Sequence, residues 1–450
     1  MKKGFKIVIS TLAALLIICG VLFAVYKLML DPHRQTLKPT IDSRGGVRAD
    51  VQSLPLDEML TFDQAKEDID YVMGMLRGRH PAWLEDDNER VVAVEAQYLA
   101  ELDALDEKRS DGVTVLEEWR SLCRIMHELY DGHSNICRSY SGDRYIDDVS
   151  QIIQYGAPVK INGEPTEDVF ERLLALCQYE TLEWAKLNFG DFFTNEACLA
   201  LAGVDTSDGV TFTFDTGNDD LDAYCRFVPP DEPAEAASSS DDSKWVYYSI
   251  DDYNKIGVFT LASCIYDDEY RATVKEFFNS VSEAGVEDVI VDLRNNRGGN
   301  SLVANEFIKY LDIDGYYTWA CHVRIGNHLI KNKRSYVKNE KQDPAFSGGI
   351  YVLTNTATYS SALDFTMCIM DNGIGQAIGE PSGNLPDSYG DILLFATPNS
   401  RLPFSVSYKR WFRIDESKAG LPLEPDFPCR ADEAKNTAYT IILNGHKKIR

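Results

Sequence analysis

The C-terminal half of the chain alternates strand-like and helix-like segments, and this alternation constrains the fold more than any other feature of the sequence. Three short apolar runs read as buried strands, at 255–263, 286–293 and 349–355. Amphipathic helical patterns follow them, at 268–285, 301–311 and 360–373. Strands that alternate with helices form a parallel sheet with right-handed crossovers. The sequence therefore predicts an α/β core over residues 244–450.

In such sheets ligands bind outside the carboxyl ends of the strands, so the loops that leave those ends are the first candidates for a site. One of them, "IVDLRNNRGGNS" at 290–301, places Gly298 and Gly299 just before a helix. Glycine amides can approach a ligand where a Cβ would block access, and the first amides of a helix lack intrahelical partners. The loop is thus predicted to stabilise an oxyanion, and an ordinary turn is the plainer alternative.

The second loop, "TNTATYSSALDF" at 354–365, places Ser360 and Ser361 at the start of the next helix. A serine on a strand-to-helix turn has the placement of a nucleophile elbow. The alternative is that Ser360 only caps the helix.

A serine nucleophile needs a base, and among the histidines His133 in "YDGHSN" (130–135) is the best candidate. It follows a long amphipathic helix, and an imidazole is basic near neutral pH. The alternative is that His133 ends the helix without a chemical role. His127 and His80 are interpreted as packing and turn residues.

Together these motifs resemble the serine peptidase superfamily that includes C-terminal processing (tail-specific) peptidases, the tricorn protease core and the interphotoreceptor retinoid-binding protein repeats. The resemblance rests on five stretches: "DGHS" (131–134), "VIVDLRNNRGG" (289–299), "YVLTNTATYSSALDF" (351–365), "IGEPSGN" (378–384) and "PLEPD" (422–426). It implies a crotonase-like (ClpP/crotonase-type) α/β core and serine peptidase chemistry without a metal or organic cofactor.

The family's nucleophile motif, T-x-S-x-x-[ED]-x-F, is matched here at Thr358, Tyr359, Ser360 and Phe365, whereas Leu363 stands at its acidic position. The resemblance therefore implies Ser360 as the nucleophile. It also implies that Gly299 and Ser361 supply backbone N–H groups to the oxyanion hole, with Gly298 beside them.

The processing peptidases use a lysine base about 25 residues after the serine, and the corresponding stretch at 379–391, "GEPSGNLPDSYGD", contains no lysine. The tricorn-like branch uses a histidine from the DGH region and a downstream glutamate. That pattern implies His133 as general base and Glu416 in "RIDESKAG" (413–420) as the orienting acid, with Asp415 and Glu424 as alternatives. In that branch a serine directly precedes the histidine, whereas Gly132 does here.

Lys2, Lys3 and Lys6 precede an apolar run at 7–26, and about 20 helical residues span a bilayer core. The run lacks an A-x-A cleavage site, so residues 1–30 are predicted to be an uncleaved signal anchor, with the catalytic body outside the cytoplasm. A lipid-modified Cys19 is the lesser alternative, because Ile18 is not the small residue that a lipobox requires.

The remaining organisation follows from composition and pattern. We expect a tether at 31–60, followed by a helical region at 61–140 that ends in the DGHS motif. A cap at 141–243 comes next and includes an acidic Ser/Pro linker at 229–243. Too few residues separate the DGHS motif from "APVKINGEPTEDVFERLL" (157–174) for a PDZ domain, so specificity for C-terminal carboxylates is not carried over.

The formal net charge of −26 argues against nucleic acid as a partner, because phosphate binding requires clustered Lys and Arg. The ten cysteines stand singly without a C-x-x-C, which predicts neither a zinc site nor a dense disulfide framework and leaves one or two bridges open. The sequence thus predicts a membrane-anchored extracytoplasmic serine endopeptidase that acts on peptides or proteins by a Ser-His mechanism. The alternative is a non-catalytic peptide- or ligand-binding protein on the same fold. No pattern indicates the oligomeric state.

Overall fold

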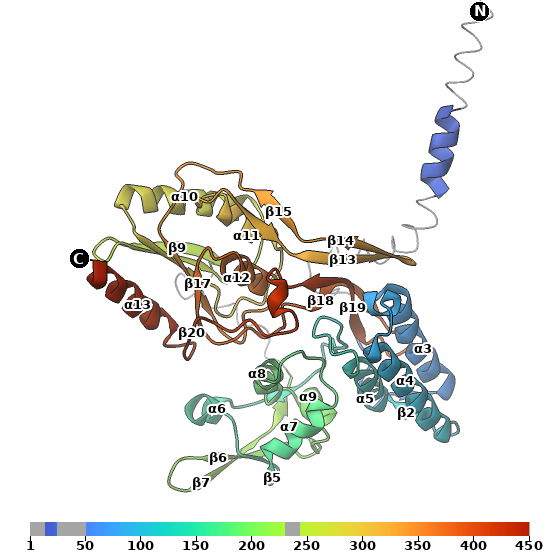
Figure 1. The fold of residues 1–450 in the computed structure, drawn as a ribbon. Coiled ribbons are helices and arrows are strands. Elements are labelled where there is room, and N and C mark those ends of the chain that lie inside the picture. Colours follow the sequence, from blue (N-terminus) through green and yellow to red (C-terminus); the bar gives the residue numbers. More distant parts are fainter. Residues whose placement is uncertain (1–13, 25–50, 230–243, 450) are drawn as a thin grey trace, which may run out of the picture.

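The computed structural model describes residues 14–24, 51–229 and 244–449, and its centre is a six-stranded sheet (Figure 1). Its strand order is β20-β17-β16-β11-β10-β9. The strands are β9 (Val246–Asp251), β10 (Ile256–Leu261), β11 (Asp288–Asp292), β16 (Gly349–Thr354), β17 (Gln376–Gly379) and β20 (Phe427–Pro428). All neighbouring pairs are parallel except β9 with β10. The predicted α/β core with a parallel sheet is confirmed.

Both faces of this sheet are covered, which explains why its strands are continuous apolar runs. Along β11, Val289 and Val291 join one hydrophobic core and Ile290 joins the other, because successive side chains point to opposite faces. The helices that cover the first face are α10 (Asp268–Ala284), α11 (Leu302–Ile308) and α12 (Ser361–Asp371). The opposite face is covered by α13 (Ala434–Ile449).

A second sheet joins this core to the N-terminal helices. It is antiparallel, with the order β14-β13-β19-β18. Its strands are β13 (Ala320–Ile325), β14 (His328–Asn332), β18 (Tyr389–Ala396) and β19 (Pro403–Phe412), and β12 (Gly315–Thr318) pairs separately with β15 (Ser335–Lys338). The helices are α3 (Phe62–Arg79), α4 (Glu89–Glu107) and α5 (Val115–His127), after the short strands β1 (Met59–Leu60) and β2 (Val113–Thr114). Capping boxes at Thr61 and Thr114 start α3 and α5.

The cap follows the DGHS motif and lies below the core in Figure 1. Its small sheet has the order β5-β4-β6-β7, and a separate pair joins β3 to β8. Its strands are β3 (Tyr145–Ile146), β4 (Lys160–Ile161), β5 (Glu164–Pro165), β6 (Val210–Asp215), β7 (Asp220–Cys225) and β8 (Phe227–Val228). Its helices are α6 (Ser150–Tyr155), α7 (Thr166–Leu174), α8 (Leu182–Phe192) and α9 (Glu196–Leu201).

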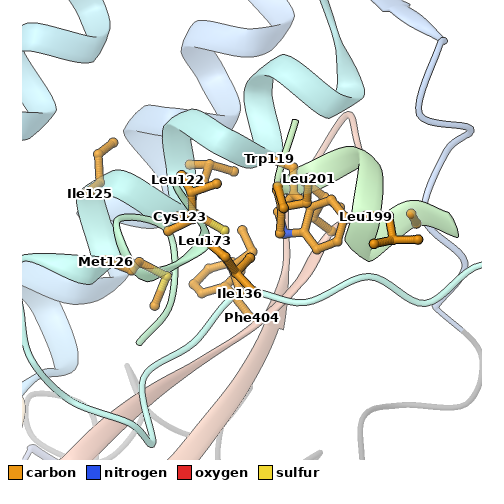
Figure 2. Close-up of a cluster of buried hydrophobic side chains, with 14 of the residues drawn as sticks. Trp119, Leu122, Cys123, Ile125, Met126, Ile136, Leu173, Leu199, Leu201 and Phe404 are labelled. Carbon is orange, nitrogen blue, oxygen red and sulfur yellow. The ribbon is translucent and has the colours of Figure 1, made fainter. Parts of the chain in front are cut away.

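The apolar face of α5 holds the cap and the second sheet together. Figure 2 shows Trp119, Leu122 and Cys123 of α5 beside Leu173 of α7 and Phe404 of β19. All of these side chains belong to one buried cluster. Because α5 packs on both neighbours, the loop that follows it, which carries the DGHS motif, is fixed relative to the cap and to β19.

Among the residues that the structure describes, no helix is long and apolar enough to cross a membrane. Only residues 14–24 of the predicted membrane helix 7–26 are described, and they are helical. The remainder of that helix, most of the tether and linker residues 230–243 lie outside the described residues. All ten cysteines are free.

Phe404 tests whether this shared core supports the fold. Its ring stacks on Phe395 at 5.3 Å and meets Tyr71 edge-on at 6.0 Å. Phe404→Ala should lower the free energy of unfolding by about 3–5 kcal/mol, because it leaves a cavity in a buried cluster. Urea unfolding followed by tryptophan fluorescence measures the change. Val92 of α4 is 70% exposed, so Val92→Ala is the control. This substitution should change the free energy of unfolding by less than about 0.5 kcal/mol. Equal effects of the two substitutions would contradict this view of the core.

Candidate active site

Ser360 has a backbone conformation that residues other than glycine rarely adopt. It lies between β16 and α12 with φ +54° and ψ −123°, and it makes no side-chain cap to the helix. The backbone is held by two hydrogen bonds, from Ser360 N–H to Asn384 Oδ1 at 2.8 Å and from Asp364 N–H to the Ser360 carbonyl at 2.9 Å. Strained backbone of this kind occurs at sites where the surrounding structure fixes a functional side chain. The hydroxyl therefore has the placement of an elbow nucleophile and is not engaged in capping.

The neighbouring Ser361 is buried, and its hydroxyl is occupied. Its Oγ donates to the Gly299 carbonyl at 3.0 Å and lies 3.0 Å from Ser301 Oγ, which in turn donates to Asp364 Oδ2 at 2.8 Å. Burial, offset in part by the Ser301 hydrogen bond, raises the pKa of Asp364 to about 7. The Ser361 hydroxyl thus supports the loop at 290–301 that carries Gly298 and Gly299, which we call the glycine loop. Because this hydroxyl is already bonded, Ser360 is the better candidate nucleophile.

The glycine loop approaches Ser360 so closely that it excludes side chains. Gly298 has φ +97°, and a Cβ there would lie 2.8 Å from the Ser360 Cβ. The Gly298 amide donates to Asn296 Oδ1 at 2.9 Å and is therefore occupied. Within the described part of the chain, the amides of Gly299 and Ser361 have no acceptor, as an oxyanion hole requires. Their role as its two donors stays a prediction.

Hydrogen bonds tie the glycine loop to the loop at 354–365 that carries Ser360. Asn295 N–H donates to Asn355 Oδ1 at 2.9 Å, and Asn355 Nδ2 donates back to Asn295 Oδ1 at 2.8 Å. In addition, Tyr359 N–H donates to the Asn296 carbonyl at 3.0 Å. The glycine loop is therefore not an isolated turn, because it is bonded to the residues that position Ser360.

His133 lies beside the residue that precedes Ser360. Its ring centroid is 4.9 Å from that of Tyr359, and its Cε1 faces Gly390 of β18, where a Cβ would lie at an ordinary contact distance of 3.8 Å. Both ring nitrogens are buried and without a hydrogen-bond partner, so no hydrogen bond joins His133 to Ser360 in this structure. Burial lowers the pKa of His133, although the charges of Asp131 and Asp391 oppose the shift. The imidazole is thus neutral at physiological pH, as a general base must be.

Asp131 and His80 fix the loop that carries His133. Asp131 Oδ1 accepts from the His133 N–H at 2.9 Å, and Oδ2 lies 3.2 Å from His80 Nε2. Burial alone would raise the pKa of Asp131, but the hydrogen bond and charge of His80 hold it well below the usual range. Ser134 Oγ accepts from Ser407 N–H of β19 at 2.8 Å. The interpretation of His80 as a structural turn residue agrees with this pairing.

The structure does not bring Glu416 to His133. Glu416 is exposed in η3 (Glu416–Lys418), and no hydrogen bond or ion pair joins it to His133 among the described residues. The preceding Asp415 donates its N–H to Asp371 at the C-terminal end of α12, whereas Ser360 stands at the N-terminal end. The 11 residues of α12 separate these ends by about 16 Å. Glu424, the other alternative, is exposed as well.

The carboxylates beside His133 are Asp131 and Glu180, and sequence analysis did not identify either as an orienting acid. Their oxygens lie 3.9 Å and 4.0 Å from His133 Nδ1. Glu180 precedes α8 in "YETLEW", and no local pattern distinguishes it from other acids of the chain. Burial and the charge of Asp131 raise its pKa well above the usual range.

Asp131, His133 and Glu180 are also the one group of described residues with the spacing of a metal site, with ligand atoms within 4.8 Å of one another. Both Asp131 oxygens, however, already face His133 N–H and His80. We therefore describe the three residues as two buried carboxyl groups close to an imidazole, with Nδ1 3.9 Å and 4.0 Å from their nearest oxygens.

Comparison with known proteins identifies the family of the core and similar folds. Residues 255–427, which include the glycine loop and Ser360, match the model of Peptidase family S41. No curated protein matches the chain. The crystal structure of mature CPAF has a TM-score of 0.60 at 13% identity, covers 86% of this chain and 97% of its own, and shows a shared fold.

Two further solved structures are similar to a lesser degree. The photosystem II D1 C-terminal processing protease has a TM-score of 0.44 at 10% identity, over 83% of this chain and 94% of its own. The tricorn protease has a TM-score of 0.35 at 12% identity, over 85% of this chain and 37% of its own. Scores this low carry no argument about which branch the chain follows. The chain carries a Peptidase family S41 domain and is a serine-type peptidase.

Proposed function

We propose that the protein is a membrane-anchored extracytoplasmic endopeptidase that cleaves peptide bonds through a Ser360 acyl-enzyme, with His133 as general base. The observation that carries this proposal is the conformation of Ser360. A serine with φ +54° stands at the N-terminal end of a helix, with its amide bonded to Asn384 and a glycine loop against its Cβ.

The chemistry follows from these positions. Ser360 Oγ attacks the scissile carbonyl and gives its proton to the neutral His133, and the oxyanion receives hydrogen bonds from the Gly299 and Ser361 amides. His133 then protonates the leaving amine, and a water molecule hydrolyses the ester with His133 again as base. The mechanism requires His133 to close onto Ser360 when substrate binds, because catalytic hydrogen bonds often tighten only in the complex.

The membrane anchor is supported by charge and by exposed apolar surface. Lys2, Lys3 and Lys6 precede the apolar run 7–26. In the described part of that run the side chains of Leu16 and Ile17 are 69% and 67% exposed, and exposed apolar surface of this kind is compatible with lipid contact. The positive-inside rule then places the body outside the cytoplasm.

The nucleophile is tested with a fluorophosphonate, which reacts with activated serines. The wild-type chain and Ser361→Ala should be labelled, because the Ser361 side chain does not react, whereas Ser360→Ala should not be labelled. Gel fluorescence measures labelling, and a thermal melt checks that each variant is folded. Absence of labelling in the folded wild-type protein would favour the non-catalytic binding protein. Loss confined to Ser361→Ala would show that the other serine is the nucleophile.

The topology is tested by adding a protease to intact cells that express the full chain. With the three lysines inside, the body over residues 51–449 should be digested, while a cytoplasmic marker protein stays intact. Immunoblotting with an antibody against the body follows the digestion. Full protection of the body in intact cells, with digestion after lysis, would contradict an extracytoplasmic location.

A further inference from the structure

We infer that Glu180, which the cap contributes, is the carboxyl group that orients His133, in the role that the sequence analysis assigned to Glu416. This inference rests on the proposed Ser360–His133 mechanism and adds a residue to it. Glu180 is a positioning residue, since it would act on the reaction only through the imidazole.

The geometry singles out one oxygen. Glu180 Oε1 lies 4.0 Å from His133 Nδ1, and both atoms are buried without a hydrogen-bond partner. The Glu180 side chain is only 4% exposed. A buried carboxyl oxygen without a partner is costly, and a bond to Nδ1–H would satisfy both atoms at once. That bond would leave Nε2 unprotonated, which is the tautomer that can accept a proton from serine.

Asp131 is the rival, and its oxygens are already engaged. Oδ1 accepts from the backbone N–H of His133, and Oδ2 faces His80 Nε2. These contacts hold the loop, and a rotation of the Asp131 carboxylate toward Nδ1 would break them. Glu180 can approach Nδ1 without losing its other bond, because only its second oxygen, Oε2, is occupied.

That second oxygen connects Glu180 to the nucleophile. Glu180 Oε2 accepts from Leu385 N–H at 2.8 Å, and the adjacent Asn384 accepts from the Ser360 N–H at 2.8 Å. The next cap residue, Thr181, donates from Oγ1 to the Gly383 carbonyl at 2.7 Å. The segment 383–385 therefore holds Ser360 on one side and the cap on the other, so the distance between nucleophile and orienting acid depends on the docking of the cap.

Aromatic packing reinforces the same contact. Trp184 of α8 stacks on Tyr359, with ring centroids 4.2 Å apart, and His133 lies against the same tyrosine. A Cβ at Gly383 would lie 2.6 Å from Trp184 Cε3, so the loop and the helix are in close contact. The cap side of the site is thus built from the residues that flank Glu180.

The charges around the pair decide its pH dependence. Asp131 and Asp391 face His133, Asp131 and Arg90 face Glu180, and the Tyr359 hydroxyl and His80 complete the surroundings. The active form needs a neutral imidazole and an ionised carboxyl group, and burial with the charge of Asp131 raises the pKa of Glu180, so activity should rise with pH as the coupled pair loses its proton. In Glu180→Gln the Glu180 carboxyl group no longer titrates, so only His133 sets the acid limb, and burial lowers the pKa of His133. The rise should then move to lower pH.

Glu180→Gln tests the inference, because the amide oxygen can still accept from Leu385 N–H while the charge is lost. Turnover of casein by the purified full chain is measured across pH. We expect kcat to fall roughly 10²- to 10⁴-fold with little change in KM. The acid limb of the profile should move to lower pH. Glu183→Gln, an exposed glutamate in the first turn of α8, is the matched control, and Glu416→Gln tests the rival position. Both should stay within about twofold of wild type.

Each outcome separates this inference from the proposed function. If Ser360 and His133 are required but Glu180→Gln keeps the wild-type kcat and acid limb, Glu180 is not the orienting residue and the Ser-His mechanism stands. A lower kcat with an unmoved acid limb means a structural role and also overturns the inference, as does a loss confined to Glu416→Gln. A wild-type chain without turnover or labelling overturns the proposed function and this inference together.

Glu180→Asp covers the case in which the glutamine variant does not fold by thermal melt. It keeps the charge but withdraws the carboxylate by one methylene group. The variant should lose turnover while its acid limb stays near that of wild type. Wild-type turnover in Glu180→Asp would contradict the inference, because an orienting bond depends on that distance.

Discussion

The close approach of Gly298 to Ser360 is the contact on which the site depends. A side chain at Gly298 would occupy the space of the Ser360 Cβ, so the two loops can lie together only because one of them is bare. This approach brings Gly298 against Ser360 and the Ser361 amide, and Gly299 follows directly in the same loop. The hydrogen bonds between Asn295 and Asn355 and the unusual φ of Ser360 serve the same arrangement. The parallel sheet supplies the rigid strand ends from which both loops leave.

The parts of this account that sequence predicted are those in which local pattern and topology determine the outcome. Buried parallel strands are continuous apolar runs, so β10, β11 and β16 could be recognised in the sequence. Loops meet at the carboxyl ends of such strands, which predicted that Gly298 and Ser360 lie close together. The role predicted for Glu416 depends on more than local pattern. Sequence does not show at which end of α12 the loop that carries Asp415 and Glu416 lies. In the structure this loop is bonded to Asp371 at the C-terminal end of α12, whereas Ser360 stands at the N-terminal end.

Glu180 could not be found from sequence because its role depends on tertiary contacts. It lies in a cap of short elements whose docking is set by packing between α5, α7, α9 and β19, as Figure 2 shows in part. The same docking brings Trp184 onto Tyr359 and Thr181 onto Gly383. In the proposed mechanism the position of the base depends on the docking of the cap, because Glu180 and Ser360 are both bonded to the segment 383–385.

The central claim, that Ser360 and His133 act as one unit, is tested most directly by kcat on casein for Ser360→Ala, His133→Ala and the double variant, each checked for folding. The account predicts that each single substitution lowers kcat by roughly 10⁴-fold or more and that the double variant is little worse than either, because residues that act together are not additive. A folded His133→Ala within about tenfold of wild type would contradict it.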